Sequence, residues 1–213
     1  MPEERGTAHI SREEIQRQLR FCGEIRELHR ARGGNAPLAC TQTYGCQQNE
    51  ADTERLRGYL AEMGYAFTQD PAEADVIIIN ACAIREHAEH RVLGAVGALV
   101  HTKREKPGQL ICVCGCMAQE PHTAETLRRS YRQVDLVFGP QALWRFPELF
   151  HRLLTRRGRI FDADPSAGAI AEGIPVVRQE GVKAWVPVMY GCNNYCSYFI
   201  VPYVRGRERS RAP

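Results

Sequence analysis

Short, almost unbroken apolar segments alternate with amphipathic segments through the centre of this 213-residue chain. The strongest apolar segment is Val76–Asn80, and the others are Leu38–Thr43, Leu110–Cys114 and Val134–Phe138. Strands of this kind are buried on both faces, which is typical of a parallel sheet covered by helices. Because crossover connections are right-handed, the pattern predicts an α/β fold with a doubly wound parallel sheet over residues 38–156.

The sequence on either side of this predicted sheet indicates three further parts. Residues 1–37 are expected to be a helical extension, because a capping box at Ser11 precedes an apolar stripe with helical spacing. Residues 157–182 are expected to be a linker, since their first half is rich in Gly, Ala, Asp and Pro. Residues 183–213 would start a second domain with a strand over Lys183–Tyr190, and the chain stops before that domain could close.

Nine cysteines are unusual for a chain that begins with a polar segment and shows no secretory signal. The longest aliphatic run, Val76–Ile79, is too short to cross a bilayer, so we expect a cytoplasmic protein without a membrane partner. In a reducing compartment, cysteines are buried apolar residues, catalytic thiols or metal ligands rather than disulfides.

Three of the cysteines follow predicted strands at equivalent positions. Cys46, Cys82 and Cys116 each lie just beyond the carboxyl end of a strand, and these ends share one edge of a parallel sheet. Glycine precedes Cys46 and Cys116, which would let the backbone approach a bulky group. We therefore expect three thiolates to come together although they are far apart in the sequence.

Two interpretations of these three thiols are open from their spacing. Three soft thiolates suit an iron–sulfur cluster better than zinc, which usually takes paired C-x-x-C ligands that are missing here. Three buried thiols without metal fit the spacing equally well. The remaining cysteines of the predicted sheet and helices are expected to be core residues: Cys22, Cys40, Cys112 and Cys114.

Arginine clusters are the main feature of the charge pattern, since the net charge is only +3. They lie at Arg128–Arg132, Arg156–Arg159 and Arg205–Arg211. Such clusters suit a polyanion, but a solvated protein surface is the interpretation that their composition favours.

Four segments match one family in the same order: Thr43–Glu54, Ile79–Glu89, Val113–Gln119 and Val134–Pro140. Together they resemble the radical-SAM methylthiotransferase family, and the resemblance runs over about residues 40–211. The third and fourth segments are most similar to the MiaB branch, which modifies isopentenyladenosine in tRNA. The branches that modify threonylcarbamoyladenosine or a ribosomal-protein aspartate share the same first domain.

The resemblance implies an enzyme that methylthiolates C2 of N6-isopentenyladenosine next to the tRNA anticodon. Such an enzyme uses S-adenosylmethionine and two 4Fe–4S clusters. Cys46, Cys82 and Cys116 would bind the first cluster, which holds or donates the sulfur, and the second would cleave S-adenosylmethionine reductively. The implied partners are the tRNA anticodon stem-loop and a reductant such as flavodoxin or ferredoxin.

The loop that would bind the second cluster departs from the family pattern C-x-x-x-C-x-x-C. Cys192 and Cys196 are present, but Phe199 occupies the third position, and a phenyl ring has no lone pair for iron. The chain also ends at Pro213, before most of the barrel that binds S-adenosylmethionine. We therefore expect this chain to be inactive alone; the alternative is a non-catalytic α/β module that binds metal or another protein.

Overall fold

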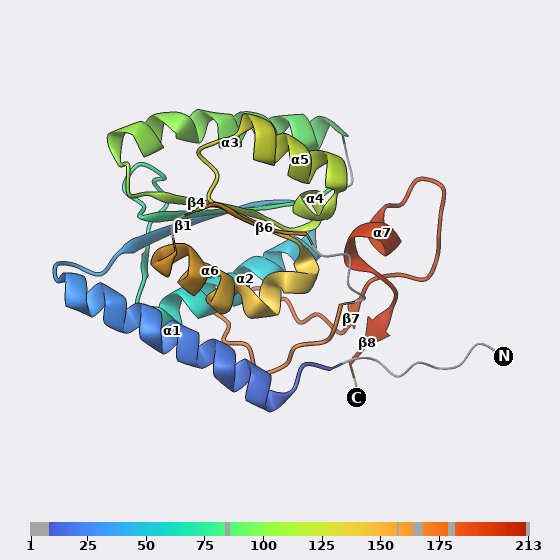
Figure 1. Cartoon of the computed structure of the whole chain (residues 1–213). Helices are drawn as coiled ribbons and strands as arrows, with labels where there is room; N and C mark the ends of the chain where they lie inside the picture. Colours follow the sequence, from blue (N-terminus) through green and yellow to red (C-terminus); the bar gives the residue numbers. More distant parts are fainter. Residues whose placement is uncertain (1–8, 84–85, 157, 164–167, 179–181, 212–213) are drawn as a thin grey trace.

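The computed structural model describes residues 9–83, 86–156, 158–163, 168–178 and 182–211. Its main feature is a parallel six-stranded sheet in the order β2-β1-β3-β4-β5-β6 (Figure 1). The strands are β1 (Leu38–Tyr44), β2 (Ala66–Phe67), β3 (Val76–Ala81), β4 (Leu110–Cys114), β5 (Leu136–Phe138) and β6 (Ile160–Asp162). The doubly wound α/β prediction is confirmed.

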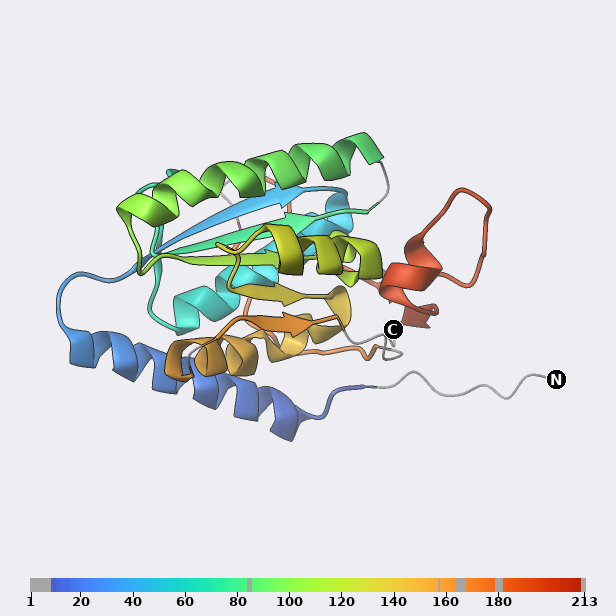
Figure 2. The same cartoon turned by 45° about the horizontal axis from the view of Figure 1, so that its top comes forward.

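Helices cover both faces of this sheet, as Figures 1 and 2 show. One face carries α1 (Arg12–Arg32), α2 (Gln47–Glu62) and α6 (Phe146–Thr155), the last entered through the 3-10 helix η1 (Pro140–Arg145). The other face carries α3 (Glu86–Glu105) and α5 (Pro121–Ser130). The short helix α4 (Cys116–Gln119) follows β4 directly. None of the helices in the described residues has the length and apolar character that a transmembrane span requires.

Strand β3 holds the two layers together because its side chains alternate between them. Ile77 and Ile79 pack in the core under α3, whereas Ile78 packs in the core under α2 and α6, and all three are fully buried. Burying such a side chain contributes about 1.5–3 kcal/mol. A continuous apolar strand is therefore stable only at the centre of a covered sheet.

Two parts of the sheet and one outlying strand differ from the sequence prediction. Strands β2 and β6 were not expected, and Ile160–Asp162 falls in the stretch predicted as linker, although it pairs with β5. Both strands are too short for a periodic pattern. The strand expected over Lys183–Tyr190 is reduced to β7 (Met189–Tyr190), which pairs antiparallel with β8 (Arg209–Ser210) around α7 (Val201–Arg205).

Some positions named in the sequence analysis lie outside the described residues. They are Ile84 and Arg85 of the second motif, the ends of the chain, and residues 157, 164–167 and 179–181 of the expected linker.

The strand order reverses beside β1. Helix α2 leads the chain from β1 outward to the edge strand β2, and the chain then returns to β3 on the other side of β1. Helices α2 and α3 consequently lie on opposite faces of the sheet (Figure 1). Ligand sites of doubly wound sheets form at this reversal, outside the carboxyl ends of the strands.

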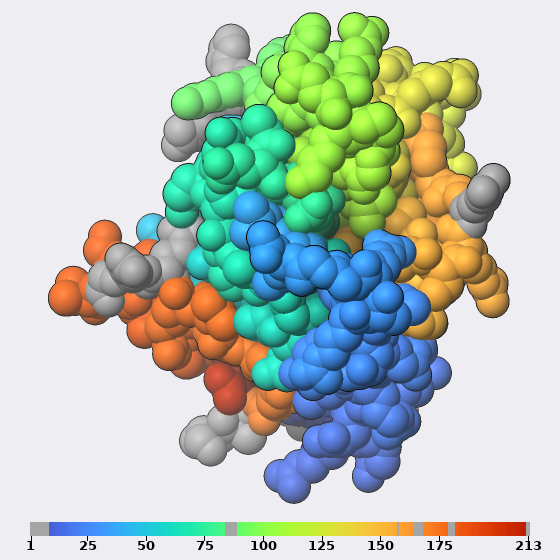
Figure 3. Space-filling view, turned by 90° about the vertical axis from the view of Figure 1, so that its left-hand side faces the viewer, coloured from blue at the N-terminus to red at the C-terminus, as the bar shows by residue number. Residues whose placement is uncertain are grey.

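The amino edge of the sheet lies on the side of the molecule that faces the viewer in Figure 3, and polar contacts within the fold close it. The Asp75 carboxylate accepts a hydrogen bond from the Leu38 N–H at 2.6 Å and pairs with Lys106 at 2.8 Å. The buried Gln109 side chain donates to the carbonyls of Pro71 and Ala74. These contacts join the segments that lead into β1, β3 and β4, and so they favour the opposite edge for a site.

Helix α1 is fixed to the fold by a buried glutamine. The Gln18 side chain is fully buried, and its Oε1 accepts a hydrogen bond from the Glu148 N–H at 3.1 Å. Glu148 lies in the first turn of α6, whose N-cap residue Arg145 makes no side-chain hydrogen bond to the helix. The first N–H groups of a helix need acceptors from elsewhere, and Gln18 supplies one from another helix.

Replacing Gln18 with Ala should lower the free energy of unfolding by about 1–3 kcal/mol, because the Glu148 N–H loses its acceptor inside the protein. The exposed Gln16 on the same helix is the matched control, and its replacement with Ala should change stability by less than about 0.5 kcal/mol. Urea denaturation followed by circular dichroism measures both. Equal effects of the two substitutions would contradict the capping role of Gln18.

Candidate functional site

Three cysteines lie together at the carboxyl edge of the sheet, and we call them the thiol row. Cys46 is the N-cap of α2, Cys82 follows β3, and Cys116 is the first residue of α4. The Cys82 N–H donates to the Tyr44 carbonyl at 2.8 Å, which holds the first two loops side by side. The Cys82 thiol lies close enough to both other thiols to shift the pKa of each. Their role as metal ligands stays a prediction.

The pairing of the strands explains why these thiols meet. Thr43, Asn80 and Cys114 lie side by side on β1, β3 and β4, because Asn80 pairs with both of the others. Cys46 comes three residues after Thr43, Cys82 two residues after Asn80, and Cys116 two residues after Cys114. Three loops of nearly equal depth therefore leave the sheet at the same point.

The electrostatics of the row differ from one end to the other. Contact with Cys82, together with burial, raises the pKa of Cys46. Contact with Cys82 lowers the pKa of Cys116. Burial acts to raise this pKa, and the neighbouring Arg205 guanidinium offsets part of that rise. Backbone N–H groups of Gln48 and Asn49, in the first turn of α2, favour the anionic form of Cys46. Cys116 is thus the more readily ionised of the two ends.

Two glycines let the loops pack this closely. A Cβ atom on Gly115 would lie 2.3 Å from Asn80 Oδ1 and 2.5 Å from the Ala81 carbonyl, and the φ of +92° disfavours any other residue. A Cβ atom on Gly45 would lie 2.9 Å from Cys82 Cβ. The glycines before Cys46 and Cys116, noted in the sequence, are therefore required by the neighbouring loops.

Beneath the thiol row lies a buried network of amides and hydroxyls. The Asn49 side chain donates to Asn80 Oδ1 at 2.8 Å, and the Asn80 side chain donates to the Asn49 carbonyl and to Thr53 Oγ1. Cys46 Sγ donates to Asn49 Oδ1 at 3.4 Å. Asn80 belongs to the second family motif, but its role could not be predicted from the sequence. The local signal is a polar residue directly after four consecutive aliphatic residues.

An arginine from the far end of the chain completes the site. Arg205, the last residue of α7, donates from Nε to Cys116 Sγ at 3.0 Å and from a terminal nitrogen to Asp52 Oδ2 at 2.8 Å. Burial disfavours its charge, but Asp52 and Cys116 outweigh burial and raise the pKa of Arg205. The interpretation of Arg205–Arg211 as solvated surface is therefore wrong for Arg205, which is only 7% exposed.

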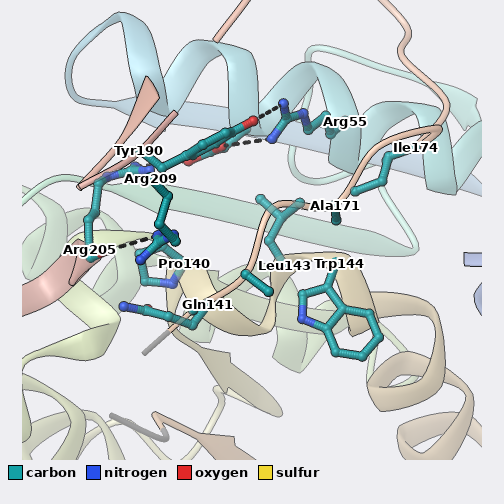
Figure 4. Close-up of a pocket in the computed structure, with 13 residues that line it drawn as sticks. Arg55, Pro140, Gln141, Leu143, Trp144, Ala171, Ile174, Tyr190, Arg205 and Arg209 are labelled. Atoms are coloured by element: carbon teal, nitrogen blue, oxygen red, sulfur yellow. Dashed lines mark hydrogen bonds and ion pairs between the residues drawn. The ribbon is translucent and has the colours of Figure 1, made fainter. Parts of the chain in front are cut away.

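Further contacts hold the segment that carries Arg205 against the sheet domain (Figure 4). The Gln141 side chain in η1 donates to the Val204 carbonyl at 3.1 Å, and Arg55 of α2 donates to the hydroxyl of Tyr190 in β7. A hollow between the two parts is lined by Asp52, Arg55, Gln141, Trp144, Tyr190, Arg205 and Arg209, among others. The part of the chain that contains β7, α7 and β8 thus packs directly beside the thiol row.

Cys192 and Cys196 lie in a loop that projects beyond the carboxyl edge (Figures 1 and 2). Cys192 is half-buried, and its sulfur accepts a hydrogen bond from the Asn194 N–H at 3.4 Å. Cys196 is exposed, and its carbonyl accepts from the Phe199 N–H at 3.1 Å. This loop offers two thiols and a half-buried phenyl ring.

The other cysteines are core residues, as the sequence predicted, and burial raises the pKa of each: Cys22, Cys40, Cys112 and Cys114. Among the residues that the structure describes, no group of three or more His, Cys, Asp or Glu side chains has the arrangement that a single metal ion needs.

The chain is similar to one protein family over the sheet domain and to a group of curated proteins over nearly its whole length. Residues 39–139 match the family described as "Uncharacterized protein family UPF0004". Proteins named "tRNA-2-methylthio-N(6)-dimethylallyladenosine synthase" are similar to nearly the whole chain. The protein from Acetivibrio thermocellus is 48% identical over 212 residues, which are 98% of this chain and 44% of that protein.

Two further relatives carry the same name. The protein from Caldicellulosiruptor saccharolyticus is 46% identical over 199 residues, covering 92% of this chain and 42% of the relative. The protein from Clostridioides difficile is 45% identical over 207 residues, covering 94% and 43%. The chain thus spans less than half the length of these curated relatives. The resemblance inferred from the four motifs is confirmed.

Replacing Gly115 with Ala should destabilise the protein by about 2–4 kcal/mol, because a strained φ and a clash with Asn80 act together. The control is Gly94→Ala in α3, where a Cβ atom meets nothing within 4 Å. That substitution should be neutral or stabilising by up to about 1 kcal/mol. Chemical denaturation measures both, and an unchanged midpoint for the Gly115 variant would contradict the tight packing of the loops.

Proposed function

We propose that this chain is part of a tRNA methylthiotransferase of the kind that its relatives' name describes. The full enzyme would methylthiolate C2 of N6-isopentenyladenosine (dimethylallyladenosine), next to the anticodon. The observation that carries the proposal is the thiol row, which gathers three cysteines of the family motifs at the reversal point of the sheet. The similarity of nearly the whole chain to these enzymes supports it.

The residues of the thiol row fit a 4Fe–4S cluster. Their donor set is three soft thiols, carried on loops that two glycines allow to pack side by side. When bound, such a cluster would supply an iron without a protein ligand, to which exogenous sulfur can attach. We assign its ligands as Cys46, Cys82 and Cys116.

Hydrogen-bond donors of the chain favour the anionic form at the two ends of the row, although contact with Cys82 and burial raise the pKa of Cys46. The first turn of α2 directs N–H groups toward Cys46, and Arg205 donates to Cys116. Asn49 and Asn80 hold the loops at a constant separation through buried hydrogen bonds. Fixed donors of this kind favour thiolate over thiol, which is the form that binds iron.

The loop of Cys192 and Cys196 does not fit a second cluster of the same kind. A three-cysteine loop leaves one iron for S-adenosylmethionine, whereas this loop has Phe199 at the third position. A cluster with two protein ligands would be labile. We therefore derive no chemistry at this loop and propose that this chain does not cleave S-adenosylmethionine.

Contacts with tRNA and with a reductant such as flavodoxin or ferredoxin are proposals that follow from the same assignment. Not every arginine of the basic clusters is free for RNA. Arg159 donates to the carbonyls of Leu127, Arg128, Tyr131 and Val134, so it caps the end of α5 rather than facing a polyanion.

Alanine at Cys46, Cys82 or Cys116 should each abolish the visible absorbance that develops when the chain is reconstituted anaerobically with iron and sulfide. Cys40→Ala is the control, because Cys40 is buried in the core under α3 and outside the row. Iron and acid-labile sulfide are measured beside the spectrum, and circular dichroism checks folding. Full iron uptake by a folded variant of the row would contradict the ligand assignment.

Phe199→Cys should raise the iron content above that of the unmodified chain, because it restores a third thiol to the loop. It should not produce 5′-deoxyadenosine from S-adenosylmethionine under strong reductant, since positioning the cofactor needs more protein than this loop. Phe161→Cys, a substitution of a half-buried Phe in β6, is the matched control for added thiol. Appreciable 5′-deoxyadenosine from the unmodified chain would show that the proposal for this loop is wrong.

A further inference from the structure

Arg205 joins the thiol row to helix α7 through a hydrogen bond to sulfur. It lies 89 residues beyond Cys116 and 153 beyond Asp52, and its guanidinium binds both. The side chains of Arg205 and Asp52 are 8% and 6% exposed. The pair is thus almost fully removed from water.

Burial of these charges is costly unless each finds a partner of good geometry. The planar guanidinium meets this condition, because Nε reaches the sulfur while a terminal nitrogen reaches the carboxylate. A lysine is a point charge and cannot hold two acceptors in this fixed arrangement. The Arg205 backbone is held as well, since its carbonyl accepts from Arg209.

We propose that Arg205 is a positioning residue with two effects: it fastens α7 to the thiol row, and it raises the reduction potential of the cluster that this row binds. The second effect rests on the proposed function. A hydrogen bond to a ligand sulfur, and a positive charge beside it, stabilise the reduced cluster, which carries one more negative charge. Asp52 opposes this charge and limits the effect.

The two partners therefore predict opposite shifts. Arg205→Gln removes the positive charge and should make reduction at least tenfold less favourable, a fall of about 59 mV for a one-electron couple. Asp52→Asn leaves the guanidinium uncompensated and should raise the potential. Arg207→Gln, an exposed arginine of the same cluster, should leave the potential unchanged. The reduction potential of the Arg205→Lys variant should lie between those of the Arg205→Gln variant and the unmodified chain.

A redox titration of the chain, reconstituted with iron and sulfide and reduced stepwise with dithionite, measures these potentials. Opposite shifts for the Arg205 and Asp52 variants support the proposal. Equal potentials, or shifts of the same sign in both variants, overturn the redox effect, because loss of packing alone would move both in one direction.

The fastening effect is measured without iron. Amide hydrogen exchange at residues 201–205 should be at least tenfold faster in Arg205→Gln than in the unmodified chain, and unchanged in Arg207→Gln. Equal exchange rates in all three overturn the fastening effect. If the unmodified chain takes up no iron, the proposed function and the redox effect fail together, whereas the exchange data still decide whether Arg205 fastens α7.

Discussion

Parallel pairing among β1, β3 and β4 is the constraint on which the rest of this structure depends. Hydrogen bonding along β3 sets Thr43, Asn80 and Cys114 at one level, and the position of each thiol of the row follows from that level. A shift of one residue in either pairing would move one loop away from the other two. It would also move the aliphatic side chains of β3 from one core to the other, so the cores and the thiol row depend on the same pairing.

Much of this arrangement could be predicted from sequence because its causes are local. The aliphatic run of β3, the glycines at 45 and 115, and the position of each cysteine after a strand are all visible within a few residues. Strands β2 and β6 were missed because strands of two or three residues at the edges of a sheet carry no periodic signal. Local patterns do not show which distant residues meet. Parallel topology does, since it brings the equivalent ends of distant strands to one edge.

The contribution of Arg205 could not be predicted in the same way. It lies in a run of four arginines within seven residues, where composition favours a solvated surface. Only its tertiary contacts with Asp52 and Cys116 distinguish it from the exposed Arg207 two residues later. Asn80 is an intermediate case, because its polarity at the end of an apolar strand is visible locally but its partners are not.

The distance along the chain between Cys116 and Arg205 has a consequence for the order of assembly in the cell. A protein is synthesised from its N-terminus, and its domains generally fold in that order. All three thiols leave the ribosome long before the arginine that will cover Cys116 has been translated. During that interval no arginine covers Cys116, and the arrival of α7 then closes the thiol row from one side. Biosynthesis therefore gives the nascent chain a period in which all three thiols are present and α7 does not yet enclose them, and the cluster proposed above would have its freest access then.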